Sequence, residues 1–153
     1  MRKRGANFRN RNAMIPGLIA QAACSEYETR LRLAVDSLRD GWMDESQFND
    51  LADTMDMLQI GMASYGKQKP DPSTEVAIEI CREALMSVRN RYLERGKFGA
   101  TGEELKAVQL LADVSLDYWN RRSGALFAFA CEQLRILRAE QRDAAKNQEK
   151  EAA

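Results

Sequence analysis

Three carboxylates recur at every third position of one predicted helix, a spacing that could hold a cation or form an acidic docking surface. They are Asp50, Asp53 and Asp56. Carboxylate oxygens are the ligands that hard cations prefer, but a single helix offers them in a poor geometry for coordination. We therefore predict no metal site, and we expect the three side chains on a solvated outer face. Asp50 and Asp53 are kept as candidate contacts for a partner.

Arginines form a second pattern near the C-terminus. Arg135, Arg138 and Arg142 follow a spacing of i, i+3 and i+7, which would let a helix track the phosphates of a nucleic acid. Glu132 and Glu140 lie nearby in the sequence, so the arginines could instead pair with them on a solvated face. We favour this pairing and keep the three arginines as candidate partner contacts.

The strongest charge pattern is at the N-terminus, where the first twelve residues carry five cations and no acid. Unpaired cations are costly to bury, so we predict that residues 1–13 form a flexible basic arm that faces solvent or a partner. Its candidate contacts are the cations and the one aromatic residue of the arm: Arg2, Lys3, Arg4, Phe8, Arg9 and Arg11.

The charge balance reverses in the segment from Asp36 to Asp56, which contains seven acids and only one base, Arg39. An asymmetry of this kind along a chain indicates two surfaces of opposite charge. The acidic segment and the basic arm could attract each other between copies, so we predict a homodimer.

Residues for catalysis are scarce. The chain has no histidine, which excludes Ser-His and Cys-His nucleophile systems, and it has neither a Walker loop nor a Rossmann glycine pattern. Its cysteines, Cys24, Cys81 and Cys131, are far apart and lack the spacing of metal ligands. We expect a non-enzymatic protein without a cofactor, with Cys81 and Cys131 as small core residues in a reducing cytoplasm.

The elements that must position these residues are predicted to be helices within one domain. The chain has 153 residues, of which 44% are hydrophobic and 30% charged, a balance that suits a single core over residues 14–142. No apolar run approaches the roughly 20 residues that span a bilayer. Cap signals predict helix starts at Ser25 with Glu28, Asp44 with Gln47, Asp71 with Pro72, and Thr101 with Glu104. A short helix is also predicted to begin at Pro16.

Glycines and one break divide the predicted helices. Gly41 and Gly96 can adopt the left-handed conformation that stops a helix. The third helix has one apolar face, formed by Val76, Ile80, Ala84, Val88 and Tyr92. A single helix from Thr101 to Leu137 would be about 54 Å long, which is too long for a compact domain of this size, so we predict a break near Gly124. Trp119 is expected in the core.

The sequence thus predicts an all-α fold, a compact antiparallel bundle of four main helices with the long C-terminal helix broken near Gly124. Residues 143–153 are expected to form a frayed tail, because they are polar and end the chain.

The order of four segments resembles a known group of proteins. The segments are the basic leader RKRGANFRNRN, the helix LAVDSLRDG, the acidic helix start DESQFNDLADTMDMLQIG and the passage ERGKFGATGEELKAVQLLADV. The layout is similar to a family of small proteins of unassigned function from phages, prophages and plasmids of Gram-negative bacteria. The resemblance implies a helical accessory protein of a mobile element, in the cytoplasm of the host cell, and it carries no catalytic residue over.

Two functions remain open at this stage. The first is stoichiometric binding to a protein partner, as an inhibitor or adaptor of a host system, a role that phage-borne proteins of this size often have and that includes anti-defence factors. The alternative is a nucleic-acid-binding regulator that uses the basic arm and the last helix. We see no short helix pair with the tight turn of a helix-turn-helix motif, and we favour the protein partner.

Overall fold

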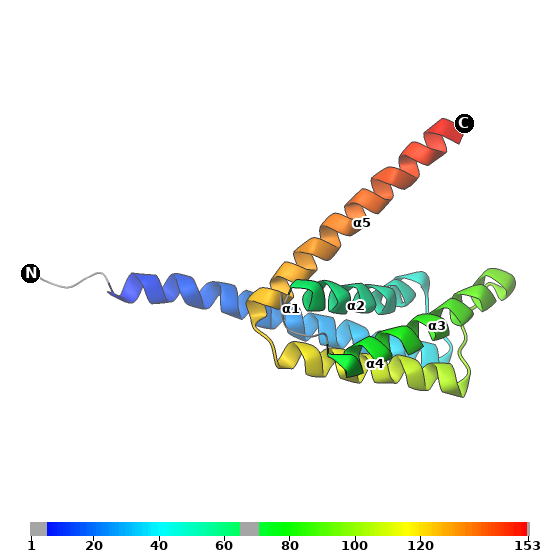
Figure 1. Cartoon of the computed structure of the whole chain (residues 1–153), viewed down its shortest axis with the longest axis horizontal. Coiled ribbons are helices and arrows are strands. Elements are labelled where there is room, and N and C mark those ends of the chain that lie inside the picture. Colours follow the sequence, from blue (N-terminus) through cyan, green and yellow to red (C-terminus); the bar gives the residue numbers. More distant parts are fainter. Residues whose placement is uncertain (1–5, 65–70, 153) are drawn as a thin grey trace, which may run out of the picture.

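The computed structural model describes residues 6–64 and 71–152, with side chains described for residues 23–64 and 71–150. These residues form five helices and no strand, so the fold is all-α as predicted (Figure 1). The helices are α1 (Ala6–Asp40), α2 (Glu45–Ser64), α3 (Pro72–Arg95), α4 (Gly102–Asn120) and α5 (Gly124–Ala152).

The helices pack as a bundle from which two ends project. The most extensive contact joins α3 and α4, while α1, α2 and α5 contact one another and α4 closes on α1 and α2. The N-terminal half of α1 and the C-terminal half of α5 extend away from this body in different directions (Figure 1). On α5, the residues from Glu140 to Lys150 are exposed as a result.

The predicted starts of α2, α3 and α4 are confirmed by their caps. Gln47 N donates to Asp44 Oδ1 at 2.9 Å, and Asp44 N donates to Gln47 Oε1 at 2.8 Å. Asp71 caps α3 by accepting a bond from Ser73 N. Thr101 and Glu104 form the same reciprocal pair at the start of α4. Each cap satisfies backbone donors that the first helical turn leaves free.

The predicted stops are also confirmed. Gly41 and Gly96 have φ values of 78° and 68°, in the left-handed region that glycine adopts without steric cost. The break near Gly124 lies between Asn120 and Gly124, and Ser123 Oγ caps α5 by accepting from Leu126 N at 3.2 Å. A helix can start here because the serine replaces an intrahelical acceptor.

The predicted organisation of the N-terminus is wrong in part. Residues 6–13, assigned to a flexible arm, form the first turns of α1, which runs through Pro16 and Ser25 without a boundary. Ser25 is no cap, since its carbonyl accepts from the Thr29 hydroxyl within the helix at 3.0 Å. The residues before Ser25 include alanine, leucine and glutamine, which favour helix, so the signal at Ser25 does not stop propagation.

The C-terminal boundary also differs from the prediction. Residues 143–152, expected to fray, continue α5 to Ala152. This stretch consists mostly of alanine, lysine, glutamate and glutamine, which are among the strongest helix formers. Local propensity therefore extends the helix beyond the last tertiary contact.

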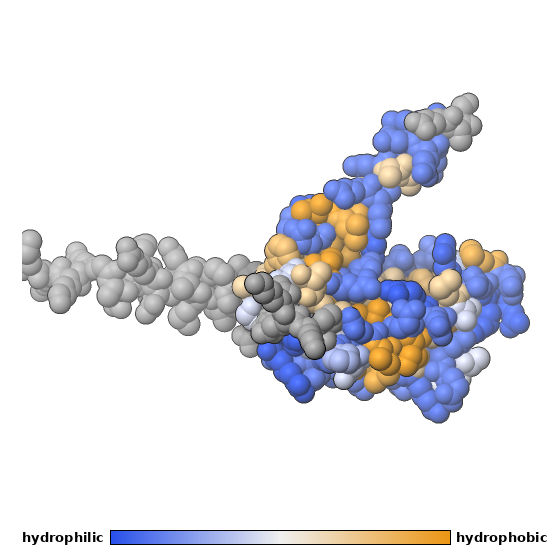
Figure 2. Space-filling view, viewed as in Figure 1, coloured by the Kyte–Doolittle hydropathy of each residue, from blue (hydrophilic) through white to orange (hydrophobic). Residues whose placement is uncertain are grey.

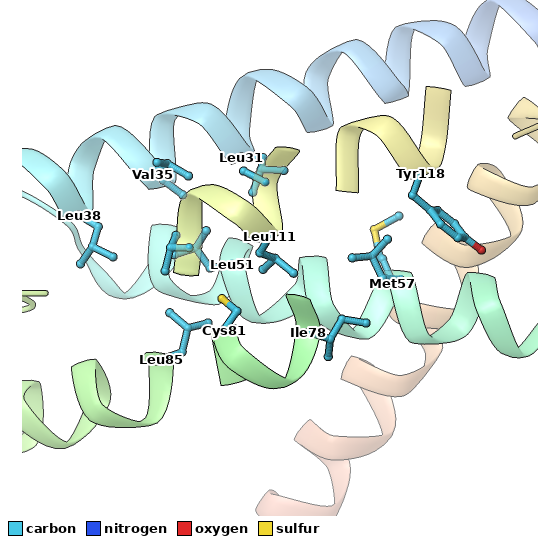
Figure 3. Packing of buried hydrophobic residues seen from close by; sticks show 14 of the residues in the cluster. Leu31, Val35, Leu38, Leu51, Met57, Ile78, Cys81, Leu85, Leu111 and Tyr118 are labelled. Carbon is cyan, nitrogen blue, oxygen red and sulfur yellow. The ribbon is translucent and has the colours of Figure 1, made fainter. Parts of the chain in front are cut away.

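The core lies where all five helices meet. Leucines from three helices are fully buried, with Leu31 1% and Leu51 and Leu111 0% exposed, and their side chains point toward a common interior with Cys81 of α3 (Figure 3). Trp119 is 3% exposed, which confirms its predicted place in the core. Gly61 of α2 permits this packing, because a Cβ there would lie 2.7 Å from the Trp119 ring.

The predicted apolar face of α3 is wrong at its start. Val76 and Ile80 are 56% and 45% exposed, whereas Ile78, Cys81 and Leu85 are buried. The inner face of α3 is rich in small residues, among them Ala77, Cys81 and Ala84. Small side chains let α4 approach closely, and the larger Val76 and Ile80 are left on the outside.

Candidate partner-binding cleft

Arg138 joins α5 to α2 through an ion-pair cluster. Its Nε donates to Asp53 Oδ1 at 2.8 Å, and its Nη2 donates to Asp56 Oδ2 at 2.6 Å. Partial burial lowers the pKa of Arg138, but the hydrogen bonds and charges of the two aspartates outweigh it and raise the pKa overall. The predicted solvated face is therefore wrong for Asp53 and Asp56, which lie at the root of the projecting half of α5.

Asp50 lies at a different interface, the one between α2 and α1. It forms an ion pair with Arg30 of α1, and its side chain is only 16% exposed. The predicted solvated face is wrong here too, because α1, which packs against α2, supplies a cation. The periodic aspartates thus fasten α2 to two neighbouring helices, and no group of three or more metal-binding side chains occurs among the described residues.

The space beside Arg138 is an open cleft between the body and the projecting part of α5. Its volume is about 930 Å³. Two further arginines line it, Arg89 from α3 and Arg142 from α5, and neither is in an ion pair with any described residue. The remaining lining residues are Phe48, Asn49, Ala52, Asp53, Gln141 and Ala145. The cleft therefore combines one large apolar side chain, Phe48, with two cations that have no ion-pair partner among the described residues.

The three predicted arginines do not act together. Arg135 forms two bonds with Glu132 of its own helix, at 2.9 and 2.7 Å, which confirms the intrahelical pairing. Its hydrogen bonds and charge lower the pKa of Glu132, and those of Glu132 raise the pKa of Arg135. Arg138 and Arg142 line the cleft instead.

Sequence reasoning missed Arg89. The residue lies about fifty positions before Arg138 and Arg142 on a separate helix, and no local pattern links it to them. Only the packing of α3 beside α2 brings its side chain to the cleft. The role of Arg89 therefore follows from tertiary structure and not from a sequence pattern.

A smaller cavity of about 230 Å³ lies between α1, α2 and α5. Ligand pockets are commonly about 300–1,000 Å³. A polar group at its wall is already bonded, since Tyr27 Oη lies 2.6 Å from Ser115 Oγ. Burial raises the pKa of Tyr27 despite this bond. The cavity is smaller than common ligand pockets, and its tyrosine hydroxyl already has a hydrogen-bond partner. It is therefore a weaker candidate for a binding site than the open cleft.

The cysteines show no activated thiol. Burial raises the pKa of Cys81 to about 12, and it also raises the pKa of Cys24 and Cys131. A nucleophilic cysteine requires the opposite shift, because the thiolate is the reactive form. Cys81 is fully buried as predicted, while Cys131 is half-buried beside the smaller cavity.

The candidate contacts of the N-terminal arm stay predictions. Arg2, Lys3 and Arg4 lie outside the described residues, and Phe8, Arg9 and Arg11 lie on α1 at positions whose side chains are not described. Within the described part of the chain, no helix is both long and apolar enough to cross a membrane.

Comparison with known proteins gives no family for the chain. No family model matches it, and no curated protein or solved structure is significantly similar to it.

Proposed function

We propose that this chain is a non-enzymatic binding protein that takes an acidic segment of a protein partner into the cleft between α2, α3 and α5. The observation that carries the proposal is the pair Arg89 and Arg142, two exposed cations on separate helices that face one cleft without ion-pair partners among the described residues. Carboxylates of a partner would supply the missing charge, and Phe48 offers an apolar contact beside them.

An acidic protein segment fits this cleft better than a nucleic acid does. Asp53 lines the cleft and is paired there with Arg138. Affinity for nucleic acid comes mainly from many phosphate contacts, whereas two free arginines can bind one or two carboxylates. The resemblance of the sequence to mobile-element accessory proteins supports an inhibitor or adaptor role of this kind.

The test is a comparison of labelled probes. Fluorescence anisotropy measures the binding of four labelled probes. Two are peptides, one of glutamate, aspartate and phenylalanine and the other its amide counterpart with glutamine and asparagine. The other two are a duplex and a single strand of about 20 nucleotides. The acidic peptide should bind best, with one site per chain by calorimetry. Tighter binding of either nucleic acid, with a steep salt dependence, would favour the alternative function instead.

A matched pair of variants locates the site. Arg89→Glu with Arg142→Glu should weaken peptide binding at least about tenfold, corresponding to about 1.4 kcal/mol. Arg95→Glu with Arg121→Glu changes the net charge equally at exposed positions outside the cleft lining, and should change the affinity less than about twofold by the same conversion. Equal losses in the two variants would mean that binding follows net charge and not the cleft.

A further inference from the structure

The outer face of α3 carries the main group of exposed apolar side chains on the body. Val76, Ile80, Met86 and Leu93 are 56%, 45%, 60% and 69% exposed. At 100° per residue they fall within an arc of about 140°, on the side of α3 opposite its buried residues. Hydrophobic surface is visible over the first half of α3 and again near its end (Figure 2). Apolar patches of this kind mark interaction sites.

The same arc of α3 is acidic. It contains four exposed glutamates and no arginine or lysine, as helical spacing places them: Glu75, Glu79, Glu83 and Glu94. Only Glu79 has an ion-pair partner among the described residues, Arg82, which lies outside the arc. An occupant of this face should therefore be a helix with an apolar stripe, basic residues and no acids.

The N-terminal half of α1 has this composition. The chain carries no acid before Glu26, and Arg9 and Arg11 lie on the helix. In the sequence, Phe8, Ile15, Leu18 and Ile19 recur at a spacing that corresponds to an arc of about 100° at 100° per residue. This half of α1 extends beyond the body (Figure 1). Residues 6–22 and the stretch from Val76 to Leu93 have matching lengths, each about 26 Å at 1.5 Å per residue.

We propose that the N-terminal half of α1 of one copy lies along the outer face of α3 of a second copy. The contact is between copies because α1 is continuous from Ala6 to Asp40, and its second half is packed in the core through Leu31, Val35 and Leu38. The first half would have to break away from this helix to reach α3 of its own chain. In a two-fold dimer the contact occurs twice.

The acidic segment from Asp36 to Asp56, which the sequence suggested as the target of the basic arm, fits less well. Five of its seven carboxylates are in ion pairs inside the chain: Asp36 and Asp40 pair with Arg39, Asp50 with Arg30, and Asp53 and Asp56 with Arg138. The other two accept hydrogen bonds, Asp44 from Gln47 N and Glu45 from the Tyr92 hydroxyl. The glutamates of α3 are the larger unneutralised acidic group on a face that is also apolar.

The size of the contact sets its strength. Each helix face is about 26 Å long and 10 Å wide, or about 260 Å². The two contacts of the dimer involve four such faces, so the total buried area is about 1,000 Å², near the lower limit for a specific interface. We expect a dimer with a dissociation constant on the order of micromolar, which sedimentation equilibrium of the full-length chain between about 1 and 200 μM would measure.

Glutamates introduced on the two proposed faces test the interface, and on α3 they leave the core intact because Ile80 and Leu93 are exposed. Ile80→Glu with Leu93→Glu on α3, and separately Ile15→Glu with Leu18→Glu on α1, should each raise the dissociation constant at least about tenfold. Leu33→Glu introduces a glutamate at a residue that is 47% exposed on the second half of α1. This variant should leave the dissociation constant unchanged. A chain that stays monomeric at the highest concentration, or a dimer that resists both double variants, overturns the proposal.

A crosslink establishes which copies touch. A photo-reactive residue at Met86, in a mixture of ordinary and ¹⁵N-labelled protein, should capture residues 8–19 of the other isotopic form. Capture only within one isotopic form, or of other segments, overturns the proposal. The variants leave Arg89 and Arg142 in place, so failure here does not bear on binding of acidic peptides in the cleft.

Discussion

The two halves of α5 differ in what holds them. The first half is packed through Phe127 and Ala130, which are 3% and 0% exposed, while every residue from Glu140 to Lys150 is exposed. Both halves are helical, so propensity alone is enough to form the second. The surface of α5 turns from partly hydrophobic to hydrophilic along the same direction (Figure 2). The difference teaches that the local sequence forms the helix, whereas tertiary contacts fix its direction and stability.

The largest effect is expected where the body is packed most tightly. Leu111→Ala, at a residue that is 0% exposed, should lower the free energy of unfolding by about 3 kcal/mol, because it leaves a cavity in the core. Urea denaturation measures the change. The neighbouring Leu110 is 42% exposed, and Leu110→Ala should cost within about 0.5 kcal/mol. Similar losses at the two positions would contradict the assignment of the inner face of α4.

A smaller effect is expected at the junction of the two halves. Arg138→Ala leaves Asp53 and Asp56 without their cation, and should cost about 1 kcal/mol after allowance for the partial exposure of the cluster. Arg135→Ala, on the solvated side of the same helix, should give a smaller loss in the same denaturation experiment. A larger loss for Arg135→Ala would show that the cluster does not hold α5.

A third contrast depends on pH. Glu104 pairs with Arg91 and accepts from Thr101. Burial raises the pKa of Glu104, but these bonds outweigh burial and lower the pKa overall. A lowered folded-state pKa gives stability that is present above the usual value of about 4.3 and is lost as pH falls through the folded-state pKa.

Glu104→Gln should therefore destabilise the protein at neutral pH, and the gap to the unmodified chain should shrink at about pH 3, below the usual carboxyl range. Thermal unfolding at the two pH values measures both gaps. Glu103→Gln is the control, since Glu103 is exposed and only pairs with Lys106. A gap for Glu104→Gln that stays constant with pH would mean that shape, and not charge, explains the loss.

The smallest effect on stability is expected at the tip. Removing residues 140–153 deletes no buried side chain among those described, so the free energy of unfolding should change by less than about 0.5 kcal/mol. The same truncation removes Gln141, Arg142 and Ala145 from the cleft, and binding of the acidic peptide should be lost. A large loss of stability would show that the second half of α5 belongs to the body.

Sequence reasoning succeeded where the signal is local. The caps at Asp44, Asp71 and Thr101, the left-handed glycines and the break before Gly124 each depend on residues within four positions of one another. It failed at Ser25 because a cap residue inside a run of helix formers gives the same pattern without ending the helix. Whether such a residue caps a helix depends on the conformation of the residues before it.

The candidate site was only partly predictable. Periodicity drew attention to Asp53, Arg138 and Arg142. It could not show that Arg138 pairs with Asp53 and Asp56, which lie 85 and 82 positions before it in the sequence, across the interface of α5 with α2. For α3, two apolar stripes compete for the core, and the small residues of the inner one were favoured by close packing against α4. Choices between faces depend on the neighbouring helix.

The position of Arg138 gives the free end of α5 the mechanics of a lever. The segment from Arg138 to Ala152 is a single helical rod, about 21 Å long at 1.5 Å per residue. A rotation of about 10° at its root would carry the tip by about 4 Å for a rod of that length. A ligand that shifts the ion-pair cluster of Arg138 by a fraction of an ångström would therefore displace the end of α5 by several times that distance. A fluorophore near Lys150 could detect the displacement.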